Sequence, residues 1–91
     1  MIKKVILNGR VQSVGCRGYC AKYARKYSLH GSASNLPDGT VKLILNIEDD
    51  SVLRSYITSL IANPDAYMFF GSIIDVSISD YSGKTDGDYN F

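Results

Sequence analysis

The stretch Gly-Arg-Val-Gln-Ser-Val-Gly-Cys-Arg, residues 9–17, holds residue types that can bind an anion. It follows a short apolar run at 5–7 that is typical of a strand, and it precedes residues 18–27, whose pattern predicts a helix. The first turn of a helix carries unpaired backbone N–H groups and a partial positive charge. Arg17 adds a planar set of donors that matches the oxygens of phosphate or carboxylate. The stretch therefore predicts an anion site at the joint between strand and helix.

The glycines of this stretch do not follow the common nucleotide-binding patterns. A Walker-type phosphate loop needs two glycines separated by four residues, the second followed by Lys and then Ser or Thr, and residues 9–17 do not have this pattern. Gly9 and Gly15 also do not have the spacing of a dinucleotide fingerprint. On these general rules alone, a loop that simply connects strand and helix is the more common interpretation.

A second segment, residues 31–41, predicts a strand that ends in a Pro-Asp-Gly turn and leads into another strand. Together the two segments resemble the acylphosphatase family. The matching motifs are Gly-Arg-Val-Gln at 9–12, Val14-Gly15, Arg17, and Asn-Leu-Pro-Asp-Gly-Thr-Val at 35–41. Length and element order are similar too, so the resemblance covers essentially the whole chain.

The resemblance implies a hydrolase that splits carboxyl-phosphate anhydrides, or acyl phosphates, into a carboxylate and inorganic phosphate. Because the leaving group is good, such a protein needs little beyond positioning and charge stabilisation. It implies that Arg17 binds two phosphate oxygens while the N–H groups of residues 13–17 bind the others. It also implies that Asn35 orients the attacking water and that the substrate's phosphate takes the proton, since an amide is not a base. The expected phosphate-binding loop comprises Gln12, Ser13, Val14, Gly15, Cys16 and Arg17.

The chain departs from the family's usual residue types at several positions. These are Ser13 (usually Gly), Cys16 (usually Phe), Ser32 (usually aromatic) and Ser34 (usually basic). Ser28 stands where the family often has a helix-ending glycine, so we expect a strained helix end there. Because Arg17 and Asn35 are present, we expect the site to persist with reduced efficiency. The alternative is a domain that binds phosphate or another small anion with little or no turnover.

The apolar period changes from two to three or four and back along the chain. This pattern predicts strands at 2–8, 31–35, 41–47 and 72–79, helices at 18–27 and 50–62, and a short last strand within 88–91. The order β-α-β-β-α-β predicts one α+β domain over residues 1–91, in which an antiparallel sheet carries both helices on one face. The resemblance implies the same ferredoxin-like sandwich.

Apolar stripes predict which side chains enter the core. The stripes are Tyr19, Cys20, Tyr23, Ala24 and Tyr27; Val52, Leu53, Tyr56, Ile57, Leu60 and Ile61; and Ile74, Val76 and Ile78. The aspartates at 75, 80, 86 and 88 are interpreted as solvated charges at loops and strand ends. His30 has no motif partner, so we expect no catalytic role for it.

Composition excludes several other classes of protein. The formal net charge is only +1, and the strand at 41–47 lacks the aromatic residues of an RNA-binding sheet, so we expect no nucleic-acid partner. No apolar run approaches the ~20 residues of a membrane span or, at the N-terminus, the roughly 7 of a signal peptide. We therefore expect a cytoplasmic monomer that acts on a small molecule and does not bind membranes.

Cysteine spacing excludes two further classes. Cys16 and Cys20 do not form the CxxC motif that a metal chaperone of this architecture needs, and we expect free thiols. A cysteine phosphatase needs its thiolate in a glycine-rich anion loop, whereas Cys20 and Arg25 both lie within the predicted helix. No cluster has metal-ligand spacing, so we expect neither a metal nor another cofactor.

Overall fold

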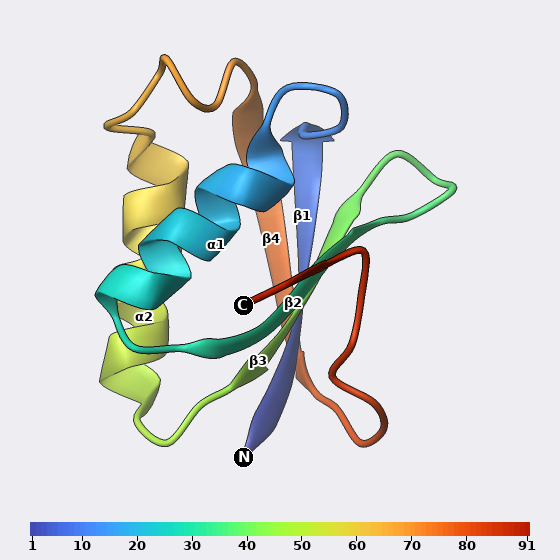
Figure 1. Cartoon of the computed structure of the whole chain (residues 1–91), viewed down its shortest axis with the longest axis vertical. Coiled ribbons are helices and arrows are strands. Elements are labelled where there is room, and N and C mark those ends of the chain that lie inside the picture. The colour runs from blue at the N-terminus through green and yellow to red at the C-terminus, as the bar shows by residue number, and fades with distance from the viewer.

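A computed structural model describes residues 1–91 as two layers, with one sheet and both helices on the same face of it (Figure 1). The elements are β1 (Ile2–Arg10), α1 (Cys16–Lys26), β2 (His30–Asn35), β3 (Val41–Asn46), α2 (Asp50–Ala62), β4 (Ser72–Asp80) and β5 (Tyr89–Asn90). The strand order is β4-β1-β3-β2-β5, and every pair is antiparallel. The predicted α+β fold class is confirmed. Neither helix has the length and apolar character needed to cross a membrane.

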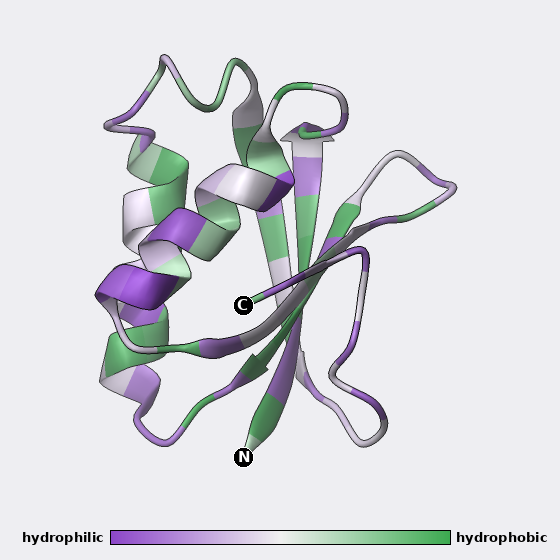
Figure 2. Cartoon of the chain, viewed as in Figure 1, coloured by the Kyte–Doolittle hydropathy of each residue, from purple (hydrophilic) through white to green (hydrophobic).

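The hydrophobic core lies between the sheet and the two helices. Hydrophobic and hydrophilic bands alternate along both helices in Figure 2. Most of the buried helix side chains come from the hydrophobic bands, and buried tyrosines complete the set. The hydroxyl of buried Tyr19 donates to the carbonyls of Ser59 (3.0 Å) and Leu60 (3.2 Å), near the end of α2. The hydroxyl of buried Tyr56 donates to the carbonyl of Cys20 (2.8 Å). These bonds join the helices and satisfy polar groups that would be costly to bury alone.

Three side chains predicted to lie in the core are exposed: Ile61, Ile74 and Ile78. Ile78 is 47% exposed near the end of β4, a strand that lies at the edge of the sheet. Ile74 is 81% exposed because Asn8 pairs with Asp75 and Gly9 with Ile73, which leaves Ile74 as the extra residue of a β-bulge. The bulge turns Ile73 inward in its place. Ile61 is 51% exposed, since one step beyond buried Leu60 turns about 100° around the helix. The remaining stripe positions of both helices are buried or pack against the core.

The end of α1 has the strain expected from its sequence. Ser28 has a φ of 57°, in the left-handed region that favours glycine. Its N–H donates to the carbonyl of Arg25 (3.2 Å), and the N–H of Leu29 donates to the carbonyl of Ala24 (2.8 Å). This pair of bonds is a Schellman motif, which usually places glycine at the position of Ser28.

We expect Ser28→Gly to raise the free energy of unfolding by about 0.5–1 kcal/mol, since it removes the left-handed strain while adding some unfolded-state entropy. In a domain of this size the melting temperature should rise by a few degrees. The matched control is Ser55→Gly, in the exposed middle of α2, which should instead lower stability. Thermal unfolding of both variants measures the effect. If Ser28→Gly and Ser55→Gly lowered the melting temperature equally, Ser28 would be unstrained.

Candidate active site

The loop between β1 and α1, residues 11–15, contains two left-handed residues, Ser13 (φ 60°) and Gly15 (φ 82°). A Cβ atom on Gly15 would lie 2.2 Å from the backbone oxygen of Met68, so only glycine fits there. Gly15 is followed directly by the right-handed residues of α1, which begins at Cys16, two residues before the predicted start. A left-handed residue beside right-handed ones forms a concave group of N–H donors that binds anions.

The backbone donors of this joint are unpaired. None of the N–H groups of residues 13–18 donates to an acceptor in the protein, and no side chain caps the start of α1. Such donors normally find partners among side chains, water or ligands. Together with the partial positive charge of the helix end, they form a site suited to a phosphate group.

Arg17 and Asn35, the two predicted catalytic side chains, line the same cleft. The cleft has a volume of about 270 Å³ and lies between the start of α1 and the end of β2. The Arg17 side chain is 41% exposed. The Oδ1 atom of Asn35 is buried and has no hydrogen-bond partner. The remaining lining residues are Val11, Ser13, Gly15, Cys16, Gly18 and Tyr89. The cleft thus combines a cation and free N–H donors with the side-chain amide of Asn35.

Asp88, interpreted from the sequence as a solvated charge, lies beside both of these residues. Its Oδ2 atom is 3.5 Å from an Arg17 guanidinium nitrogen and accepts a bond from the backbone N–H of Asn35 (3.0 Å). One carboxylate therefore connects the helix that carries Arg17 with the strand that carries Asn35. The three residues come together through pairing of β5 with β2. The sequence predicted a short last strand within 88–91, but it did not predict the partner of that strand.

The unusual serines of β2 make room for this C-terminal segment. The Ser34 hydroxyl accepts a bond from the Asp88 N–H (3.0 Å). A Cβ atom on Gly87 would lie 2.3 Å from the Ser34 oxygen and 2.9 Å from the Ser32 oxygen. Because these contacts are already tight, an aromatic residue at 32 or a long basic residue at 34 would displace the segment. Serine at positions 32 and 34, where the family usually has larger residues, therefore leaves the space that residues 87–90 occupy.

Gln12 and Val14 belong to the predicted phosphate-binding loop but do not line the cleft. The Gln12 amide donates to the carbonyls of Leu36 (2.6 Å) and Thr40 (2.9 Å), which ties the loop to the β2–β3 connection. Val14 is buried, and its carbonyl accepts a bond from the Phe70 N–H (2.9 Å). The Gln12 side chain and the Val14 backbone thus tie the loop to two other segments, while Ser13, Gly15, Cys16 and Arg17 line the cleft.

Cys16 and Cys20 are buried free thiols on successive turns of α1, with their sulfur atoms 3.8 Å apart. The hydrogen bond from Cys20 lowers the pKa of Cys16, and the nearby charge of Arg17 acts in the same direction. The same hydrogen bond, together with burial, raises the pKa of Cys20 well above its usual value. The pair contributes to the core beneath the cleft.

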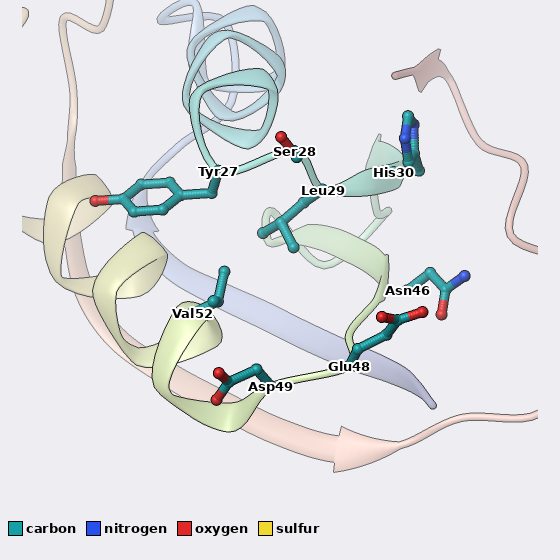
Figure 3. Close-up of a pocket in the computed structure, with 8 residues that line it drawn as sticks. All are labelled: Tyr27, Ser28, Leu29, His30, Asn46, Glu48, Asp49 and Val52. Carbon is teal, nitrogen blue, oxygen red and sulfur yellow. The ribbon is translucent and has the colours of Figure 1, made fainter.

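A second, larger cavity of about 330 Å³ lies between the end of α1 and the start of α2 (Figure 3). Its rim carries the carboxylates of Glu48 and Asp49, which would repel an anion. Asp49 also caps the start of α2, because its carboxylate accepts a hydrogen bond from the Ser51 N–H (2.9 Å). This cavity holds His30 but neither Arg17 nor Asn35.

Comparison with known proteins gives the class of this fold and site. The family model described as Acylphosphatase matches residues 3–90. An acylphosphatase of Deinococcus radiodurans is 43% identical over 49 residues, which are 54% of this chain and 56% of that protein. One of Latilactobacillus sakei subsp. sakei is 32% identical over 74 residues, 81% of this chain and 79% of that protein. The first of these matches therefore spans only about half of the relative's length.

The match in three dimensions is more extensive. The crystal structure of acylphosphatase from Bacillus subtilis aligns with a TM-score of 0.71 and 27% identity, covering 96% of each chain. Because the family model covers nearly the whole sequence, this chain belongs to the acylphosphatase family. The resemblance stated from the two sequence motifs is confirmed.

Proposed function

We propose that this protein hydrolyses acyl phosphates to a carboxylate and inorganic phosphate. One observation carries the proposal: a single cleft is lined by Arg17 and Asn35 and lies at the loop whose N–H groups, at residues 13–18, are unpaired. Membership of the acylphosphatase family and the name of the Bacillus subtilis protein support it. We keep the sequence prediction of a cytoplasmic monomer as part of this proposal.

The groups divide the reaction between them. The loop N–H groups and Arg17 bind the phosphate oxygens and stabilise the negative charge that develops on them. The Asn35 oxygen accepts a hydrogen from the water and holds it for attack on phosphorus from the side opposite the leaving group. The bond from water oxygen to phosphorus forms as the bond to the carboxyl oxygen breaks. A carboxylate leaves, and the water's proton passes to a phosphate oxygen to give dihydrogen phosphate.

The decisive experiment is hydrolysis of benzoyl phosphate by the purified protein in the presence of EDTA. Positive charge for the phosphate comes from Arg17 and the helix start, so we expect turnover that EDTA leaves unchanged. Phosphate release must depend on protein concentration and exceed the spontaneous rate. Absence of turnover in a folded protein would contradict the proposed function.

Millimolar phosphate with EDTA is expected to raise the melting temperature, because a ligand that binds only the folded state stabilises it. Differential scanning fluorimetry measures the shift, with chloride at equal ionic strength as the control. No shift, or a shift abolished by EDTA, would contradict a metal-independent phosphate site. A shift without turnover would favour the alternative function, a domain that binds small anions.

A further inference from the structure

We propose that Tyr89 forms the binding wall for the acyl group and that the enzyme prefers acyl phosphates with an aromatic or other apolar acyl group. This inference rests on the proposed function and names the substrate class of the same cleft. It concerns the end of the substrate that the loop and Arg17 do not hold.

The strand register places Tyr89 on the same side of the sheet as Asn35. Tyr89 in β5 pairs with Ala33 in β2, and Ala33 is a buried core residue on the helix-covered face. Because side chains alternate along a strand, Asn35 shares that face with Ala33. Asn35 is thus the diagonal neighbour of Tyr89, a separation of roughly 7–8 Å that an aromatic ring can reach across.

Tyr89 differs in character from the rest of the cleft. It is the only aromatic residue among those that line it, and the residue as a whole is 39% exposed. Its hydroxyl makes no hydrogen bond within the protein, so no internal contact accounts for its position. The cleft, of about 270 Å³, lies between the start of α1 and Tyr89. An apolar acyl group in that space would remove both its own surface and that of the ring from water.

The backbone around Tyr89 is fixed on both sides. Before it, Asp88 is bonded to Asn35 and Ser34. After it, Phe91 and Gly31 exchange two backbone hydrogen bonds of 2.9 Å. The C-terminal segment accordingly runs across β2 in Figure 1. Because its backbone is already fixed, Tyr89 loses little conformational freedom when the acyl group binds.

The test compares benzoyl phosphate with acetyl phosphate in steady-state kinetics of wild-type protein, Tyr89→Ala and Tyr89→Phe. We expect Tyr89→Ala to raise KM for benzoyl phosphate by roughly three- to tenfold, the value of one aromatic contact. In Tyr89→Ala, three other quantities should stay within about twofold of their wild-type values. They are KM for acetyl phosphate, kcat for both substrates and the inhibition constant of phosphate. Tyr89→Phe should behave like wild type. Tyr67→Ala, in an exposed tyrosine outside the cleft, is the matched control.

The outcomes separate the two proposals. If wild type hydrolyses both substrates but Tyr89→Ala leaves the ratio of their KM values unchanged, the acyl-wall proposal is overturned and the proposed function stands. If wild type hydrolyses neither substrate, both are overturned. Should Tyr89→Ala unfold, Tyr89→Thr removes the ring while keeping a residue suited to a strand. The ratio of its KM values for the two substrates then tests the acyl-wall proposal.

Discussion

Replacing Arg17 with alanine is expected to lower the turnover of an acyl phosphate by about 10²–10³-fold, the usual loss when a preorganised donor to developing charge is removed. Inhibition by phosphate should weaken in parallel, because Arg17 supplies the cation of the cleft in both the ground state and the transition state. The variant also leaves the Asp88 carboxylate without its partner, 3.5 Å from where the guanidinium was, which adds repulsion to any phosphate. Steady-state rates and phosphate inhibition constants measure both losses.

Arg25→Ala is the matched control for this prediction. Arg25 lies in the last turn of the same helix and is exposed, away from the cleft. Its removal should leave kcat and phosphate inhibition within about twofold, since charges separated by more than a Debye length of ~8 Å are screened. If Arg17→Ala and Arg25→Ala reduced turnover equally, Arg17 would have no special role in catalysis.

Asn35→Ala is expected to abolish most turnover while phosphate still binds. The Asn35 oxygen is the free buried acceptor of the cleft, and we assign it to the water rather than to the phosphate. Misplacing a reacting group by ~1 Å can cost about 10²-fold in rate, and losing the group that holds the water should cost at least as much. Phosphate inhibition should stay near the wild-type value because the loop N–H groups and Arg17 are intact.

Asn46→Ala, at the far end of the neighbouring strand β3, controls for the loss of an amide. It should leave both turnover and phosphate inhibition unchanged. The division of roles fails if Asn35→Ala loses phosphate binding as fully as Arg17→Ala does. The role of Asn35 itself fails if its variant keeps wild-type turnover.

The sequence predicted those parts of the molecule that depend on short-range pattern. Helix α2 lies where it was expected, and most strand ends agree within two residues, because apolar period and turn residues are local signals. Arg17 and Asn35 were predicted from the resemblance of two motifs to a family, and the structure places both residues at one cleft. The expectation that the helix end at Ser28 is strained is confirmed by the positive φ value of that residue.

Features that depend on pairing between distant segments could not be predicted. The bulge that exposes Ile74 arises from the register between β1 and β4. The contact of Asp88 with Arg17 joins residues 71 positions apart and depends on a two-residue strand. Contacts of this kind are set by the packing of the whole chain. From the sequence, Ser32 and Ser34 were only departures from a family pattern. The structure explains them, because Gly87 packs against both side chains.

The two edges of the sheet differ, and each has a feature that hinders pairing with another molecule. An open edge strand offers unpaired N–H and C=O groups, which is how folded proteins begin to aggregate. β5 presents an edge of only two residues. β4 is long, but the bulge interrupts it. In addition, the Asp75 carboxylate accepts a hydrogen bond from the N–H of Val76 (3.0 Å). The bulge that exposes Ile74 therefore also makes this edge a poor template for edge-to-edge association.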